Sequence, residues 1–143
     1  MNVKQLSIFL ENKPGHLENA LAVLSDQKIN IITLTIAESS DFGIARMIVT
    51  KPDDAASALK ANHFTCSITD VLALEIDDTP GALLKALKVF SRLKLNIEYM
   101  YAFTQKRGDR AVMIFRFDDI EAAKNGLLTE GFNIVKNIDI IGA

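Results

Sequence analysis

The stretch ENKPGHL at residues 11–17 decides the fold, because it joins a strand to a helix and is nearly repeated later in the chain. The second copy is DDTPGAL at residues 77–83. Pro14 and Pro80 are 66 positions apart (80 − 14), and the same offset separates Gly15 from Gly81. A repeat at fixed spacing indicates one supersecondary unit that is used twice.

The residues on either side of the first copy predict a half-buried strand followed by an amphipathic helix. Within residues 3–10 the aliphatic residues Leu6, Ile8 and Leu10 fall on one parity, which is typical of a strand with one buried face. Pro14 then ends the strand pattern. Apolar residues follow at i, i+3, i+4 and i+7, as expected of one helix face; these are Leu17, Ala20, Leu21 and Leu24. This helix is expected to end near Lys28.

The remainder of the first unit predicts two more strands, a second helix and a closing strand. Residues 29–36 are rich in β-branched side chains, and residues 44–50 form the next strand after a polar turn. A helix begins at Pro52, where proline and the acidic residues after it suit a helix N-terminus. A strand near residues 64–68 completes the order β-α-β-β-α-β.

The second unit copies this order, and its first helix repeats the apolar stripe at the 66-residue offset with Leu83, Ala86, Leu87 and Phe90. We expect a helix that ends at Gly131, a hairpin turn at residues 106–109, and strands at residues 71–76, 95–103, 110–117 and 132–141. The predicted fold is α+β, with a domain at residues 1–69 and another at residues 70–143. Because each half is too small to bury a large core alone, we expect the two to pack side by side, with antiparallel sheets and helices on one face.

Composition and charge exclude several classes of protein. The chain has 143 residues, 49% of them hydrophobic, and a net charge of −2, which argues against a nucleic acid or an anionic membrane as partner. No apolar run approaches the roughly 20 residues that span a bilayer. The single cysteine, Cys66, excludes an internal disulfide. We therefore expect a soluble protein of the cytoplasm.

The repeated turn suggests a binding site. A turn that leads into a helix presents unpaired backbone N–H groups and the positive end of the helix dipole, and both attract a carboxylate or phosphate. Asn30 and Asn96, again 66 positions apart, open the second strand of each unit and carry a donor and an acceptor that could bind a zwitterion. The simpler alternative, in which Pro-Gly is only a turn and Asn only a cap, stays open.

In this order of elements, LENKPGHL with INI resembles the ACT domain, and IDDTPGAL with LNI resembles a second copy, so the resemblance covers essentially the whole chain. It implies two ferredoxin-like units that bind an amino acid or a similar small zwitterion. In such proteins the ligand lies at the seam between two ACT units. The resemblance also implies a metabolic enzyme or a regulator as partner.

The serine-binding ACT domains of phosphoglycerate dehydrogenase contact their ligand through a His-x-Asn-x-Pro-Gly turn and the Asn that opens strand two. Together with the first helical turn, this resemblance gives the expected ligand-binding residues: Leu10, Asn12, Pro14, Gly15, His16, Leu17 and Asn30 in the first unit, and Ile76, Asp78, Pro80, Gly81, Ala82, Leu83 and Asn96 in the second. Leu10 and Ile76 stand where the family has His, which argues against serine as the ligand. Asp78 stands where the family has Asn, and its negative charge suits an ammonium group or a polar cationic side chain better than an anion.

Three functions remain open at this stage. The first is a non-catalytic regulatory protein whose ligand shifts the packing of its two units. The second is an interaction module without a ligand, and the third, which we favour least, is a small acylphosphatase-like enzyme on the same architecture. We expect no catalytic residues, because no Ser/His/Asp or Cys/His set falls on convergent loops. We also expect no cofactor and no metal site, and leave open whether the chain forms a homodimer.

Overall fold

The computed structural model describes residues 2–103 and 108–141, except for the side chains at positions 138 and 141. Backbone contacts divide the chain into two compact units that change over between Thr69 and Asp70. We call Lys4–Thr69 the N-terminal unit and Asp70–Ile140 the C-terminal unit. In the described part of the chain no helix has both the length and the apolar character needed to cross a membrane.

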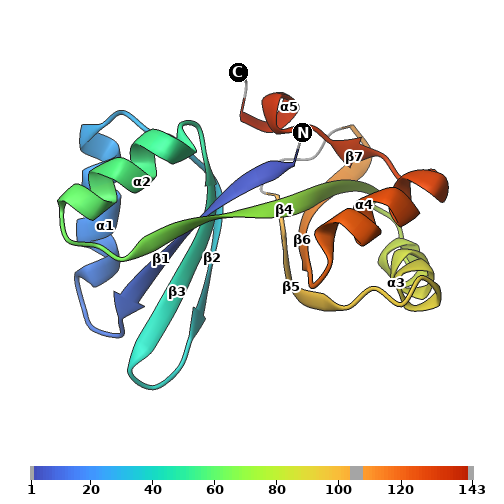
Figure 1. Cartoon of the computed structure of the whole chain (residues 1–143), viewed down its shortest axis with the longest axis horizontal. Helices are drawn as coiled ribbons and strands as arrows, with labels where there is room; N and C mark the ends of the chain where they lie inside the picture. The colour runs from blue at the N-terminus through green and yellow to red at the C-terminus, as the bar shows by residue number, and fades with distance from the viewer. Residues whose placement is uncertain (1, 104–107, 142–143) are drawn as a thin grey trace. The chain divides into compact units, whose positions relative to one another are not determined.

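The N-terminal unit is a sheet in the order β2-β3-β1-β4 with two helices on one of its faces (Figure 1). β3 is antiparallel both to β1, where Leu10 pairs with Gly43, and to β2, where Ile36 pairs with Ala45. The elements are β1 (Val3–Glu11), α1 (His16–Asp26), β2 (Ile31–Glu38), β3 (Phe42–Val49), α2 (Pro52–Ala61) and the first residues of β4 (Cys66–Asp77).

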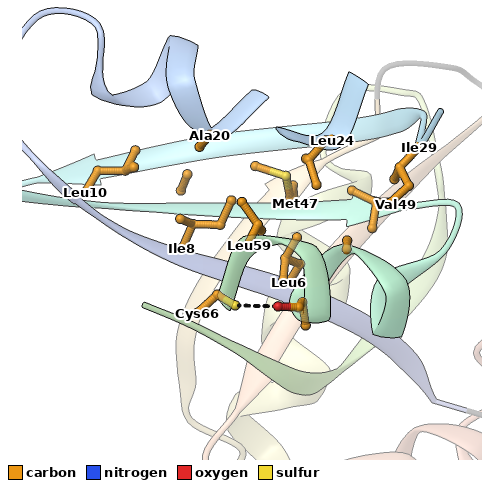
Figure 2. Packing of buried hydrophobic residues seen from close by; sticks show 13 residues of the cluster. Leu6, Ile8, Leu10, Ala20, Leu24, Ile29, Met47, Val49, Leu59 and Cys66 are labelled. Atoms are coloured by element: carbon orange, nitrogen blue, oxygen red, sulfur yellow. Dashed lines mark hydrogen bonds between the residues drawn. The ribbon is translucent and has the colours of Figure 1, made fainter. Parts of the chain in front are cut away.

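The core of the N-terminal unit is formed by the sheet face that the helices cover. Figure 2 shows Leu6, Ile8 and Leu10 of β1 packed with Leu24 of α1 and Leu59 of α2, all fully or almost fully buried. Cys66 also belongs to this core, and its Sγ donates a hydrogen bond to the carbonyl of Ala56 at 3.6 Å. Burial raises the pKa of the Cys66 thiol.

The C-terminal unit has the same arrangement, with the strand order β5-β6-β4-β7. Two helices again lie together on one face of the strands (Figure 1). The elements after β4 are α3 (Ala82–Arg92), β5 (Ile97–Ala102), β6 (Arg110–Phe117), α4 (Ile120–Thr129), β7 (Ile134–Val135) and α5 (Asn137–Ile141). The expected α+β fold with antiparallel strands and two β-α-β-β-α-β units is thus confirmed.

Aromatic side chains fill the C-terminal core where the N-terminal core is aliphatic. Phe90 of α3 meets Phe115 and Phe117 of β6 edge to face, with ring centroids 5.3 and 5.4 Å apart. Phe90 stands at the position of Leu24 in the repeat. Edge-to-face pairs are a favourable aromatic geometry, so the larger side chain is accommodated with specific contacts.

Two predicted strand boundaries are wrong. The strands expected at residues 64–68 and 71–76 form one continuous strand, β4, because the backbone at Asp70 is held in the sheet by Arg116, whose Nη1 donates to the Asp70 carbonyl at 2.8 Å. The strand expected at residues 132–141 is reduced to Ile134–Val135, and α5 follows it. Acidic Asp139 in the first turn of α5 suits a helix N-terminus.

Smaller differences have local causes. β2 starts at Ile31 rather than at residue 29, because Lys28 has a positive φ of 57° and the N–H of Ile29 donates back to the carbonyl of Leu24. Of the hairpin turn expected at residues 106–109, Lys106 and Arg107 lie outside the described residues. Gly108 lies in a turn with φ of 63°.

Phe90→Ala should reduce the free energy of unfolding by about 3–5 kcal/mol, because it removes a buried ring with three aromatic neighbours and leaves a cavity. Leu84→Ala on the same helix is the matched control, since Leu84 is 56% exposed; its effect should stay within about 0.5 kcal/mol. Urea unfolding of both variants measures the difference. Equal effects would contradict the described packing of α3.

Candidate functional site

The turn before α1 and the turn before α3 share one backbone geometry. Gly15 and Gly81 are the N-cap residues of these helices, with φ of 87° and 84°, in the left-handed region that glycine adopts without strain. Neither helix has a side-chain cap, whereas the Asp119 side chain at the start of α4 accepts a hydrogen bond from the N–H of Ala122. A Cβ placed on either glycine would meet no atom within 4 Å. Both helix starts are therefore open to a small ligand.

Asn12 has a structural role in its turn. Its Nδ2 donates to the carbonyl of Ser40 at 3.2 Å, and its N–H donates to the carbonyl of Asp41 at 2.9 Å. These bonds fasten the turn to the β2–β3 hairpin. In the C-terminal unit the N–H of Asp78 likewise donates to the carbonyl of Asp109 at 3.2 Å, but a carboxylate cannot replace the amide donor of Asn12.

His16 satisfies a backbone donor at the edge of the sheet. Its Nδ1 is the acceptor of a hydrogen bond of 2.7 Å from the N–H of Glu11. The ring stacks on Phe64, with centroids 5.4 Å apart. At the equivalent position of the C-terminal unit Ala82 has no side chain that could accept such a bond.

The N-terminal unit brings part of the predicted site together. A cavity of about 160 Å³ is lined by Leu10, Asn12 and Leu17 together with residues of the β2–β3 hairpin. A second cavity of about 250 Å³ is lined by Leu10 and His16 among others. Pro14 and Gly15 lie exposed in the turn.

The strand-two asparagines lie far along the sheet from the turn of their own unit. Asn30 exchanges hydrogen bonds with Thr50, and the next residue, Ile31, pairs with Val49 at the end of β3. Leu10 pairs with Gly43 near the start of β3, so it lies at the opposite end.

The C-terminal unit shows the same separation, since Ile97 pairs with Phe117 and Ile76 with Ala111. Asn96 precedes Ile97, and its carbonyl accepts from the N–H of Asp118 at 3.2 Å. The expectation of a ligand shared by two units stays a prediction.

The C-terminal unit contains a cavity of about 250 Å³ that includes Ile76 and Ala82 of the predicted site. Asp78, Pro80 and Gly81 are exposed, and Leu83 packs partly buried against the core. The charged residues of the cavity were not among the predicted site residues; they are Glu75, Asp77, Lys85, Arg110 and Glu130. The sequence feature that could have identified them is the pair of opposite charges, Asp77 and Arg110, at cross-strand positions of β4 and β6.

Ion pairs organise this cavity. The Nε atom of Arg110 lies 3.5 Å from Asp77 Oδ1 and 3.7 Å from Glu75 Oε2, so one guanidinium faces two carboxylates. Glu130 is held separately by Arg92 in a two-bond arrangement with distances of 2.8 and 3.0 Å. Hydrogen bonding to Arg92 lowers the pKa of Glu130 and raises the pKa of Arg92.

The described residues contain no group of three or more His, Cys, Asp or Glu side chains that could hold a metal ion. His63 is exposed with a positive φ of 69°, whereas Cys66 is buried in the core. These two residues therefore lie in different environments.

Each unit is a ferredoxin-like α+β domain in which a Pro-Gly turn leads into an uncapped helix start. The sequence model of the family described as the ACT domain pair matches residues 1–142. The chain therefore belongs to the ACT domain pair family, as the sequence analysis expected.

Solved structures agree with this assignment. A protein from Bacteroides thetaiotaomicron is 40% identical, with a TM-score of 0.92, and the match covers 100% of this chain and 98% of that chain. The regulatory subunit of aspartate kinase from Thermus thermophilus has a TM-score of 0.65 at 15% identity over 92% of this chain and 94% of its own. The subunit from Thermus flavus has a TM-score of 0.63 at 14% identity, over 90% and 92%. Among curated proteins, none matches this chain in sequence.

His16→Ala should destabilise the protein by about 1 kcal/mol more than His16→Asn, because Asn retains an acceptor near the position of Nδ1. Both variants lose the ring that stacks on Phe64, so their difference isolates the bond to Glu11. Urea unfolding gives the difference, and amide hydrogen exchange at Glu11 reports the bond directly. Exchange at Glu11 that is equally fast in the Ala variant, the Asn variant and the wild type would contradict it.

The pKa of Glu130 should lie below its usual range in the folded protein and return toward that range in Arg92→Gln, because the paired guanidinium favours the carboxylate. A carboxyl group with a lowered folded pKa stabilises the fold above its unfolded pKa. This contribution disappears as the pH falls through the folded value. NMR titration of the Glu130 carboxyl measures the shift. An identical titration in the variant would show that Arg92 has no such effect.

Proposed function

We propose that the chain is a non-catalytic regulatory protein that binds an amino acid at the turns preceding α1 and α3. The observation that supports this most is the duplicated glycine with positive φ, which starts a helix without a side-chain cap and with open space around it. Backbone N–H groups at a helix start are suited to a carboxylate. Membership of the ACT domain pair family and the shared fold of the aspartate kinase regulatory subunits agree with a regulatory role.

The two turns should differ in what they contribute. In the first, the amide of Asn12 is engaged with the β2–β3 hairpin, and the ligand would meet chiefly the helix start and the aliphatic side chains of Leu10 and Leu17. In the second, Asp78 supplies a carboxylate that favours the ammonium group of an amino acid. The ligand class is therefore a zwitterion rather than a simple anion.

The output of binding is a population shift. A ligand that contacts one arrangement of the protein more extensively than another favours that arrangement by the difference in binding free energy. The changed surface would then be presented to a metabolic enzyme or a regulator, in a monomer or a homodimer of this chain. The buried thiol of the single cysteine, Cys66, suits a reducing compartment such as the cytoplasm.

A second candidate function is that of an interaction module without a ligand. Phe9 and Phe42 are large apolar residues that are 49% and 62% exposed, and both line a cavity of about 500 Å³. Exposed apolar surface of this kind often marks a protein contact. An acylphosphatase-like enzyme stays the least favoured alternative.

A thermal-shift screen of the twenty amino acids tests the proposal. An amino acid present at 100 times its dissociation constant adds about 2.7 kcal/mol to the stability of the native state, which raises the unfolding midpoint by several degrees. Absence of a shift with every amino acid would favour the interaction module. Hydrolysis of an acyl phosphate would refute the non-catalytic assignment.

For an amino acid that shifts the midpoint, Gly15→Val and Gly81→Val should lower its affinity, because a branched side chain blocks approach to the helix start. Both substitutions also place a non-glycine residue at positive φ and should cost some stability. Gly108→Val is the matched control, since Gly108 has φ of 63° and open surroundings but does not begin a helix. If calorimetry finds unchanged affinity in both turn variants, the ligand binds elsewhere.

A further inference from the structure

We propose that the cavity in the C-terminal unit binds a small amino acid with an apolar side chain, and that the equivalent cavity of the N-terminal unit does not. The proposal rests on the proposed amino-acid binding and goes beyond it by placing one ligand inside the C-terminal unit; it does not concern the separate cavity beside the turn before α1, which is lined by Leu10 and Leu17. The cavity lies between the end of β4, the first turns of α3 and the segment that follows α4. Its volume of about 250 Å³ is below the roughly 300–1,000 Å³ of sites for drug-sized ligands, so its ligand is small.

The first donor in this cavity is the backbone N–H of Asp77. The N–H of Glu75 donates to the carbonyl of Asn133 on the β7 side of β4, and the N–H of Asp78 donates to Asp109 on the β6 side. Because strand N–H groups alternate in direction, that of Asp77 points to the β7 side, beyond Asn133. Among the described residues no acceptor is found for it there.

The second donor is the ammonium group of Lys85. Lys85 lines the cavity from α3, four residues after Gly81, and no carboxylate of the described part of the chain lies within ion-pair distance of it. An ammonium and a backbone N–H that line one small cavity are a suitable pair of donors for the α-carboxylate of an amino acid.

The acceptor in this cavity is the side chain of Asp77, which is 67% exposed. In the described part of the chain its ion-pair partner is Arg110, at 3.5 Å, and that guanidinium is shared with Glu75. A carboxylate has about four lone-pair sites, so Asp77 retains the capacity to accept from an ammonium group. The α-amino group of the ligand can bind there.

The apolar part of the lining selects the ligand's side chain. It comes from β4, α3 and the segment after α4, with Ile76, Ala82, Ala86, Val89 and Phe132. The other charged residues of the lining are already paired, Arg110 with Glu75 and Glu130 with Arg92, so a charged or strongly polar side chain would lose hydration here and would have to displace an ion pair to gain a partner. An aliphatic side chain of the size of valine or leucine is the expected occupant.

The N-terminal unit has a cavity of the same volume at the equivalent place, but its groups are already engaged. The N–H of Glu11, which corresponds to that of Asp77, donates to His16. His16 also stacks on Phe64 across this cavity. Asn19, at the position of Lys85 in the repeat, has no charge. The two units can therefore be compared directly, because the N-terminal cavity lacks both of the donors that the C-terminal cavity offers to a carboxylate.

Isothermal titration with L-valine and L-leucine tests the proposal on the full chain. Each of Lys85→Asn and Ala82→His makes the C-terminal cavity resemble the N-terminal one, and each should weaken the binding of the better of these two ligands at least about tenfold, because it removes or occupies a donor for the carboxylate. Asn19→Ala is the matched control in the N-terminal unit and should leave affinity unchanged. Urea unfolding confirms that each variant is folded.

The ligand's own groups give an independent measurement. For the wild type, 4-methylpentanoate, which lacks the ammonium group, and isopentylamine, which lacks the carboxylate, should each bind at least about tenfold more weakly than L-leucine. Competition between these compounds and L-leucine shows that they use the same site.

The results separate this proposal from the proposed function. If an amino acid binds the wild type but neither C-terminal variant changes its affinity, the cavity is not the site, and amino-acid binding itself stands. If only a charged or polar amino acid binds, the proposed apolar specificity is wrong. If none of the twenty binds, both proposals fail.

Discussion

The left-handed backbone at Gly15 and Gly81 is the constraint on which each unit depends. The chain must leave a strand and turn at once into a helix that covers the same sheet, and both glycines do this with φ near 85°. A residue with a Cβ would be strained there. The residue types that usually cap a helix through a side-chain oxygen are therefore disfavoured at this position. The glycine that the turn requires is therefore also the reason that no capping side chain covers the N–H groups at the helix start.

This constraint also explains why the repeated turn could be recognised from the sequence. The strand parity of Leu6, Ile8 and Leu10 and the helical stripe that ends in Leu24 are local patterns, and burial of a single face produces both. One short pattern leaves the assignment of strand and helix ambiguous, and its repetition at the same offset removed most of that ambiguity. The order of elements in each unit was therefore predictable.

The errors arose where the outcome depends on distant residues. Residues 132–141 are apolar and β-branched enough to suggest a strand, but β7 ends at Val135 and α5 follows. Short apolar runs do not distinguish the two structures by themselves. The break that the sequence predicted between two strands near Thr69 and Asp70 is absent for a similar reason, because Arg116 of the neighbouring strand β6 donates a hydrogen bond to the Asp70 carbonyl.

The candidate site was less predictable than the fold, because it depends on where neighbouring strands end. His16 can accept from the N–H of Glu11 because the carbonyl of Thr65, just before β4, accepts from the N–H of Phe9, and the next donor on that edge is left without a strand partner. Sequence alone identified His16 as a residue near the turn and did not indicate this bond. The two units thus have one backbone plan and different chemistry. A side chain that completes the sheet edge in one unit is absent at Ala82 in the other, where the corresponding donor is left for another molecule.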